Sequence, residues 1–483
     1  MGEIIPKIRR VLIPMVCLAS MTQAGSLAAG EPAPVWAGTG SCSATACHKG
    51  RTDPVELKGS EYEFSGAYDP HARAYQVLFE ERSFLILKNL NSREDVETIE
   101  DLRNGRNIAN LRPITNDLCL RCHVYQGYET NAPTTRMAGF ALEDGVGCEG
   151  CHGPAGNWLV PHTESWWKGL SDEQKQAEFG FYPTKDLLSR GKVCTDCHVG
   201  DGSTEVNHDL VAAGHPRLNF EYGSQLAKLP KHWRIEDDRA RHPDYESKVW
   251  VLGQIIAAQA SLDLLESRAI RSLSSDETPW PEFAEYSCFS CHHELAPKSW
   301  RQSGPSLAGK PGSLEWGTWY LPMAGTLGFE GFDPDKPGSL LGDLRKEMAR
   351  PMPDAALVVQ RAHAASEELG RLADSINRDR IAPSETRAFL ARALKVGEDG
   401  RPPDWDRAAQ QYLAIVALDK ALVESDPRYA EPRVRSTLQE LRTGLDLPRL
   451  GARGREIFDS PYQYDPGKVT EALRTIESAL PKP

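Results

Sequence analysis

The chain contains 483 residues, of which 40% are hydrophobic, and it carries a formal net charge of −12 at pH 7. This length is sufficient for two or three domains. The mean hydropathy is −0.47, and no apolar run approaches the ~18 residues of a membrane-spanning helix, so we expect no integral membrane span. The net negative charge argues against nucleic acid or an anionic membrane as a partner.

The first 30 residues have the parts of a secretory signal peptide. Lys7, Arg9 and Arg10 form a positively charged start, and an apolar segment follows at residues 11–21. Small residues near position 24 and at positions 28–30 provide cleavage sites. An uncleaved anchor is the alternative, but the apolar segment is short and contains Pro14. We therefore expect residues 1–30 to be removed on export.

Cysteine spacing is the strongest pattern in the chain. One of the 11 cysteines, Cys17, lies in the leader. The other ten form five pairs, each followed directly by a histidine: Cys42/Cys47 with His48, Cys119/Cys122 with His123, Cys148/Cys151 with His152, Cys194/Cys197 with His198, and Cys288/Cys291 with His292. Four of the pairs read C-x-x-C-H, whereas the first pair has four residues between its cysteines.

This pattern indicates covalent haem attachment. The C-x-x-C-H motif is the attachment signal for c-type haem, in which two thiols bond to the haem vinyl groups and the next imidazole ligates the iron. We therefore expect the ten cysteines to hold five haem c groups, with the five histidines as proximal iron ligands. Zinc sites and exported disulfides also use paired cysteines, but neither explains why a histidine follows every pair. Because bacteria attach c-type haem outside the cytoplasmic membrane, we expect a periplasmic protein.

Residues 31–330 hold every motif and are predicted to form one cytochrome domain. Short helices and irregular loops should dominate it, because the porphyrins would fill much of the core. Asp69 and Pro70 suit the N-cap and first position of a helix, which places His71 in its first turn. The best predicted helix covers residues 244–271, with apolar residues on one face and charged residues largely on the other.

Residues 331–483 have a different character. A Gly- and Pro-rich start leads into helical patterns at residues 354–379, 384–397, 404–425, 432–444 and 466–480. The segment contains no cysteine and a single histidine, His363. We predict a helical bundle packed against the haem domain, with a module that docks a partner as the alternative. The predicted fold is mainly α: a compact multihaem cytochrome c domain with much irregular loop, followed by a C-terminal helical bundle.

The remaining histidines decide what the irons can do. Beyond the five proximal ligands, the 13 histidines leave eight: His71, His162, His208, His215, His232, His242, His293 and His363. A second axial histidine suits an iron to electron transfer, whereas an open position permits chemistry. His208 and His215 lie between the fourth and fifth motifs, His215 on an exposed turn, and we predict both as sixth ligands. His232 and His293 are left open as ligands, His242 is expected to be solvated, and His363 to be packed in a helical core.

The second and third motifs belong to a longer pattern. Cys119-Leu-Arg-Cys122-His123 continues as Val-Tyr-Gln-Gly-Tyr, the third motif lies within residues 145–154, and Asn157-Trp158 and His162 follow; His71-Ala-Arg-Ala precedes them all. Over roughly residues 40–200 the chain resembles the soluble tetrahaem cytochromes that accept electrons from hydroxylamine oxidoreductase. Those proteins belong to a wider group with hydroxylamine oxidoreductase itself and the pentahaem nitrite reductases.

The resemblance implies particular iron ligands. It makes His71 and His162 sixth ligands, with His162 on the haem of His48 and His71 on a later haem. The second haem of such cytochromes is five-coordinate, so the haem of His123 is the candidate for an open iron. This chain departs from the pattern in its fifth motif, its longer first spacer and its C-terminal region. It has no C-x-x-C-K motif, which disfavours the lysine-ligated catalytic haem of the nitrite reductases.

Taken together, the sequence predicts a periplasmic pentahaem c-type cytochrome that transfers electrons between a redox-protein donor and acceptor through closely packed haems. The alternative is a multihaem oxidoreductase that acts on a small nitrogen or sulfur oxyspecies at one open iron. A third hypothesis is a structural subunit that docks a larger redox complex through residues 331–483.

Overall fold

A computed structural model describes residues 34–50, 59–91, 117–125, 137–275, 278–292, 314–329, 331–333, 336–396, 403–447 and 464–481. The chain divides into two units, Met1–Pro34 and Val35–Pro483. The predicted signal peptide lies outside the described residues, and everything below concerns the second unit.

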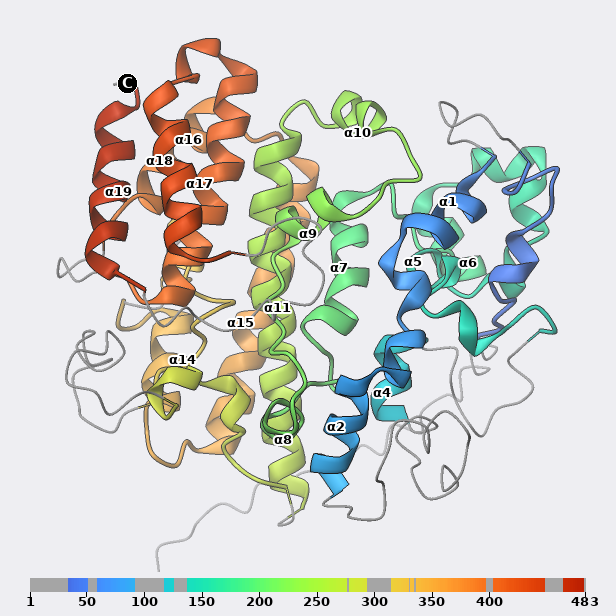
Figure 1. The fold of residues 1–483 in the computed structure, drawn as a ribbon, viewed down its shortest axis with the longest axis horizontal. Coiled ribbons are helices and arrows are strands. Elements are labelled where there is room, and N and C mark those ends of the chain that lie inside the picture. Colours follow the sequence, from blue (N-terminus) through green and yellow to red (C-terminus); the bar gives the residue numbers. More distant parts are fainter. Residues whose placement is uncertain are drawn as a thin grey trace, which may run out of the picture. The chain divides into compact units, whose positions relative to one another are not determined.

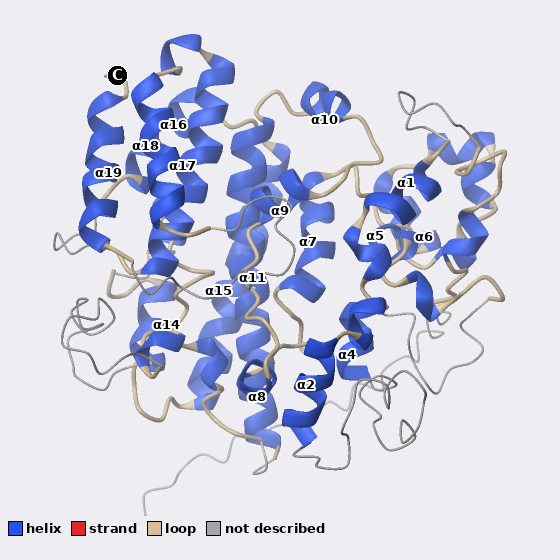
Figure 2. Cartoon of the chain, in the orientation of Figure 1, coloured by secondary structure: helices blue, strands red, loops and turns tan. Residues whose placement is uncertain are grey.

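The prediction of a mainly α fold is confirmed. The described residues form helices and loops (Figure 2), and an isolated antiparallel bridge joins Tyr286 to Trp316. The α-helices are α1 (Glu61–Tyr68), α2 (Glu81–Asn91), α4 (Asp117–His123), α5 (Cys148–His152), α6 (Asp172–Phe179), α7 (Leu187–His198), α8 (His208–Ala213), α9 (Tyr222–Lys228), α10 (Ile235–Arg241), α11 (Tyr245–Ser274), α13 (Ala324–Leu327), α14 (Leu340–Met348), α15 (Ala355–Arg378), α16 (Pro383–Ala393), α17 (Trp405–Ser425), α18 (Pro432–Gly444) and α19 (Pro466–Ala479). Short 3-10 helices join them: η1 (Thr39–Cys42), η2 (Pro70–Arg73), η3 (Gln76–Phe79), η5 (Leu142–Asp144), η6 (Ala155–Asn157), η7 (Pro161–Thr163), η8 (Ser165–Gly169), η9 (Phe283–Glu285), η10 (Cys288–Ser290) and η12 (Pro427–Tyr429).

Helix starts follow ordinary capping chemistry. The Asp69 carboxylate accepts a hydrogen bond of 3.0 Å from the backbone N–H of His71, so the predicted N-cap is confirmed, although the element it begins is a single 3-10 turn. Asp404 caps α17 in the same way, accepting from the N–H of Arg407 at 2.7 Å. Such caps satisfy N–H groups that have no partner inside the helix.

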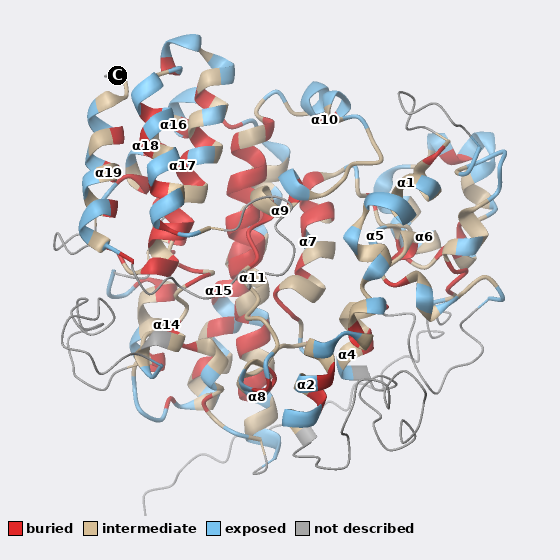
Figure 3. Ribbon diagram, viewed as in Figure 1, coloured by how far each residue is buried: buried red, intermediate tan, exposed pale blue. Residues whose placement is uncertain are grey.

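The long helix α11 lies at the centre of the packing. It runs beside α15 and also contacts α7, α9 and α17 (Figure 1). Residues 247–258 are buried on all sides (Figure 3), so the prediction of a single apolar face is wrong for this stretch. The cause is that helices cover α11 from several directions. By length and composition α11 could cross a membrane, but 72% of its most apolar window is buried within the protein, as in a core helix.

Apolar packing is distributed unevenly along the chain. One hydrophobic core joins residues of α7, α9 and α11 with residues of α14 to α19. Residues 34–186 have smaller clusters, one around Trp158 and Trp167 and another around Leu78 and Leu120. The expectation that cofactors complete the core there stays a prediction. The domain boundary near residue 330 stays a prediction, and the shared core shows that the segments on its two sides pack together.

Close packing around α11 leaves no space for a side chain at Gly253. A Cβ added to Gly253 would lie 2.7 Å from the Cβ of Tyr222, an atom that cannot move away without its backbone. We expect Gly253→Ala to lower the free energy of unfolding by about 1–3 kcal/mol, measured by denaturant titration. Gly66→Ala in α1 is the control, because no atom lies within 4 Å of its added Cβ. Equal stability of the two variants would contradict the proposed tight contact.

Candidate haem centres

Helical turns place the cysteines and histidine of the second, third and fourth motifs on one side of the backbone. The second motif lies on α4, the third forms α5, and the fourth ends α7; Cys42 ends η1 and Cys288 begins η10. Residues three and four positions apart share one face of a helix. Both thiols and the imidazole of a motif on a helix can therefore reach the same group.

Cys47 and Cys291 lie outside the regular helices. Both side chains are exposed, as is that of Cys151. Cys47 and Cys291 also lie in turns beyond the short helices η1 and η10, where the N–H of Cys47 donates to Ala44 at 2.9 Å and that of Cys291 to Cys288 at 3.3 Å. Their role in haem attachment stays a prediction.

The motif thiols are free, and thiols of different motifs meet. All ten motif cysteines lie within the described residues and none forms a disulfide there. The thiols of Cys42 and Cys148 lie close enough to shift each other's pKa, and Cys122 likewise raises the pKa of Cys197. The first attachment site therefore adjoins the third, and the second adjoins the fourth.

Glu149, between the two cysteines of the third motif, joins that motif to the segment before the first. Its side chain is buried and accepts hydrogen bonds from the backbone N–H groups of Ala37 at 2.8 Å, Gly38 at 2.7 Å and Ala155 at 2.6 Å. The local sequence pattern does not indicate this role, because two of the three N–H groups come from residues 112 and 111 positions away.

Four proximal histidines face a second histidine. The ring centres are 6.3 Å apart for His48 and His162, 6.0 Å for His71 and His198, 6.1 Å for His152 and His232, and 6.3 Å for His208 and His292. A metal–imidazole bond is about 2 Å long and the ring centre lies roughly 1 Å behind the nitrogen, so two axial ligands of one metal have ring centres about 6 Å apart. The paired rings thus fit the two axial positions of one iron. No group of three or more His, Cys, Asp or Glu side chains converges as a metal site among the described residues.

Hydrogen bonds hold several of these rings with Nε2 available to a metal. The Nδ1 atom of His48 lies 3.1 Å from the Glu61 carboxylate and that of His71 lies 2.8 Å from the Asp69 carboxylate. The Nδ1 atom of His162 lies 3.2 Å from the carbonyl oxygen of Trp158. A partner at one ring nitrogen fixes the ring's tautomer and orientation and raises its basicity as a ligand.

The surroundings of the rings favour neutral imidazole. Burial is the main cause that lowers the pKa of His152 to about 4, with smaller effects of His232, His48 and Arg190. Burial likewise lowers the pKa of His198 to about 4, with His71 adding to the effect. The neutral ring is the form that ligates a metal, so these environments suit haem ligands.

The second motif is the exception. The Nδ1 atom of His123 lies 2.7 Å from the carbonyl oxygen of Ala74, which leaves Nε2 available, but no ring contact of His123 is found among the described residues. His215 is near enough to interact electrostatically with His123 and is half-buried, not exposed on a turn as predicted. Its own Nδ1 lies 2.8 Å from the carbonyl oxygen of Pro216.

The structure brings together His71, His162 and His208 with proximal histidines, as the sequence analysis expected of sixth ligands. It also brings His232 to His152, which sequence analysis left open; the only local hint is the neighbouring Trp233. The prediction for His363 is wrong: its side chain is 59% exposed and lies 3.2 Å from Glu266, because the buried face of α15 is a different one. His242 ends α10 half-buried, and His293 lies outside the described residues.

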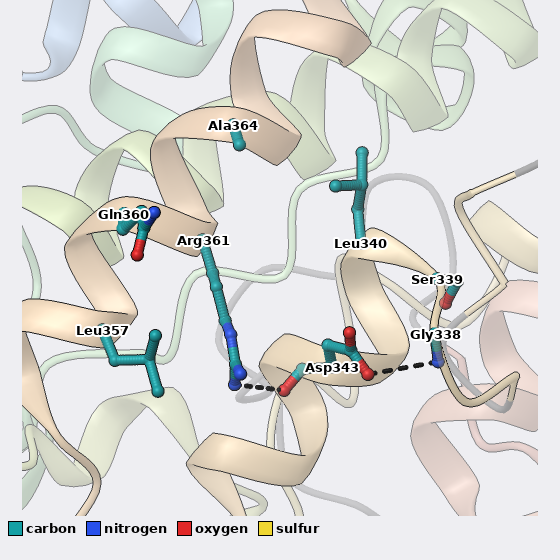
Figure 4. A pocket seen from close by; sticks show the side chains of 8 residues that line it. All are labelled: Gly338, Ser339, Leu340, Asp343, Leu357, Gln360, Arg361 and Ala364. Carbon is teal, nitrogen blue, oxygen red and sulfur yellow. Dashed lines mark hydrogen bonds between the residues drawn. The ribbon is translucent and has the colours of Figure 1, made fainter.

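A separate pocket lies between α14 and α15 (Figure 4). Its lining consists of Gly338, Ser339, Leu340, Asp343, Leu357, Gln360, Arg361 and Ala364. Arg361 donates to the carbonyl oxygen of Asp343 at 2.9 Å, and the Asp343 carboxylate accepts from the N–H of Gly338 at 3.1 Å. No cysteine or histidine lines this pocket, and both of its charged side chains are already engaged.

Comparison with protein families agrees with the geometry. Residues 44–153 match the family model described as cytochrome c554 and c-prime. The match supports a multihaem cytochrome c. It covers less than half of the chain and includes the second and third motifs together with His48 and His71. Covalently bound haem c and electron transfer follow from this family. Comparisons with curated proteins and with solved structures found no match.

The Glu61 carboxylate beside Nδ1 of His48 should lower the midpoint potential of an iron that His48 holds. A carboxylate that accepts from Nδ1 makes the imidazole a stronger electron donor and favours the oxidised iron. We expect Glu61→Gln to raise one midpoint potential by on the order of tens of millivolts, measured by a spectroscopic redox titration. Glu63→Gln, at an exposed position of the same helix, is the control. An unchanged titration of the Glu61 variant would contradict this role.

Proposed function

We propose that the protein is an exported pentahaem c-type cytochrome that transfers electrons between redox proteins. The observation that supports this best is the facing of four proximal histidines by a second histidine at the separation of two axial ligands. Bound haem supplies reversible one-electron chemistry at iron. The residues of the chain hold the irons, exclude further ligands and bring the groups close together.

The proposed axial pairs are His48 with His162, His198 with His71, His152 with His232, and His292 with His208. Two histidines fill the axial positions of an iron, which suits it to carry electrons and leaves no position for substrate. Thiol contacts between the first and third motifs and between the second and fourth favour short distances between neighbouring haems. Such distances support transfer along the chain of haems.

The location and partners follow from the same proposal. Attachment of c-type haem outside the cytoplasmic membrane supports a periplasmic location, together with the signal-like residues 1–30. The net charge of −12 favours redox partners with a basic docking surface. We propose no nucleic acid partner and no membrane insertion, and a partner-docking role for residues 331–483 is a subsidiary hypothesis.

A second candidate function rests on His123. Its ring makes no contact with a second histidine ring in the described part of the chain, in contrast to the other four proximal histidines. An iron held by His123 alone would have an open position, at which a small nitrogen or sulfur oxyspecies could be reduced or oxidised. The other four haems would then supply or remove electrons.

Spectroscopy of the purified protein tests the main proposal. We expect five haems per chain by haemochrome assay, and low-spin ferric signals for at least four of them in electron paramagnetic resonance, because two imidazoles impose a strong ligand field. Nitrite, hydroxylamine or nitric oxide should leave these four signals unchanged. Two or more high-spin haems, or fewer than five haems, would refute the proposed arrangement.

The same spectra, recorded for the wild type and for a His215→Ala variant, distinguish the two candidate functions. If His215 closes the iron of His123, the wild type shows no high-spin haem and the variant gains one. If the iron is open, the wild type already has one high-spin haem that responds to nitrite or hydroxylamine, and the variant matches it. His363→Ala, on an exposed helix face, is the control and should match the wild type in both cases.

A further inference from the structure

His232 is held differently from His71 and His162, whose Nδ1 atoms have hydrogen-bond partners. It lies in the short connection between α9 and α10, and no hydrogen bond reaches its ring nitrogens from any residue that the structure describes. Its neighbour Trp233 touches the ring edge-on, with ring centres 5.2 Å apart. The position of His232 therefore depends on what holds Trp233 and the connection.

A buried carboxylate anchors this connection. Asp238 has no exposed surface. It accepts two hydrogen bonds from the guanidinium of Arg190, at 2.9 Å and 3.1 Å, one from the indole N–H of Trp233 at 2.8 Å, and one from Arg241 at 2.6 Å. The Arg190 guanidinium also lies over the Trp233 ring, 4.8 Å from its centre. Trp233 is thus fixed from its face and from its edge.

The Arg190 guanidinium is also linked to His152, the other histidine of the pair. Arg190 Nε donates to the carbonyl oxygen of Thr184 at 2.6 Å, and the Thr184 hydroxyl lies 3.3 Å from Nδ1 of His152. One side chain is therefore linked to His152 through Thr184, and to His232 through Asp238 and Trp233. Arg190 itself lies on α7, which carries the fourth motif.

We propose that Arg190 and Asp238 form a clamp that sets the separation of the His152 and His232 rings and so keeps the third haem six-coordinate. This inference rests on the proposed axial pair of the third motif. Arg190 and Asp238 act as positioning residues, since neither touches the iron. A buried ion pair adds little to stability compared with apolar packing, but its directed bonds can select one geometry, which is what two facing ligands require.

Asp238 stays charged in this site. Burial acts to raise the pKa of its carboxyl group, but the hydrogen bonds and charge of Arg190 and the bonds from Trp233 and Arg241 hold the pKa below its ordinary value. The clamp is therefore complete throughout the neutral range, in which a periplasmic protein works.

Carbon monoxide binding to the reduced protein tests the clamp, because the gas binds a ferrous haem whose sixth ligand is missing or has dissociated. His232→Ala should bind one more equivalent than the wild type and show one additional high-spin ferric haem. Asp238→Asn keeps the shape of the side chain but removes its charge. We expect carbon monoxide to bind this variant at least about tenfold faster than the wild type, as is typical when a partner behind a metal ligand is lost.

Glu347→Gln is the matched control. Glu347 is also a buried carboxylate with an arginine partner, accepting from Arg350 at 2.6 Å and from the N–H of Asp354 at 2.9 Å, but it lies on α14, which carries no motif. Its variant should bind carbon monoxide like the wild type even if it is destabilised to the same degree. Thermal unfolding of both variants establishes that comparison.

The results test the axial pair and the clamp separately. If His232→Ala gains neither carbon monoxide nor a high-spin haem, His232 is not a ligand, and both the axial pair and the clamp are refuted. If His232→Ala responds but Asp238→Asn behaves like Glu347→Gln, the pair stands and the clamp is refuted. Should Asp238→Asn not accumulate, Trp233→Phe keeps the ring and removes only its N–H donor. It must then accelerate carbon monoxide binding, and an unchanged rate would refute the clamp.

Discussion

The separation of about 6 Å between facing imidazoles is the constraint on which the haem-bearing part of the structure depends. Each proposed pair joins positions far apart in sequence, such as His48 with His162 and His71 with His198. A metal held between two rings therefore acts as a long-range crosslink. Because metal binding contributes directly to folding free energy, this part of the chain can be stable with the small apolar clusters seen in residues 34–186.

The C-terminal helices also contact the part of the chain that carries the motifs. Asp406 at the start of α17 accepts from Arg217 at 3.1 Å and 2.5 Å and from Thr318 at 2.6 Å, and Arg217 lies 3.9 Å from the thiol of Cys288. Removing residues 331–483 would take away the counter-ion of Arg217 and expose α11. A docking role for these helices must therefore be separated from their structural role by substitutions on their exposed faces.

Covalent chemistry and helix periodicity explain what could be predicted from sequence. The haem motifs depend on fixed spacings, and the helices α15 to α19 begin and end within a few residues of their predicted positions because caps and prolines are local signals. The burial of α11 and the exposure of His363 could not be predicted, because both depend on which other helices cover each face. The roles of Glu149 and Asp238 could not be predicted for the same reason, since some of their partners, Ala37 and Gly38 for Glu149 and Arg190 for Asp238, come from distant segments.

The exposure of the motif cysteines is another property that the sequence could not predict. Cys47 and Cys291 each stand directly before a histidine, and this spacing assigns each of them to a motif. Spacing carries no information on which residues cover a side chain. Both cysteines lie in turns and are exposed, whereas Cys194, in the middle of α7, packs against the large hydrophobic core. Similar motifs therefore differ in their surroundings because different neighbours reach them.

The balance between electron carrier and enzyme depends on the loop that carries His215. Two carbonyl oxygens before it accept hydrogen bonds from α2, Ala213 from Asn89 at 2.9 Å and Gly214 from Arg82 at 3.0 Å. Two residues after it, Arg217 is fixed by Asp406. Moving this loop relative to His123 would strain such bonds, each worth about 0.5–1.5 kcal/mol and more where a charge is involved. If His215 is to close the proposed iron of His123 by such a movement, the iron–imidazole bond must exceed that cost. The anchors of this loop therefore influence whether the proposed second haem relays electrons or binds a substrate.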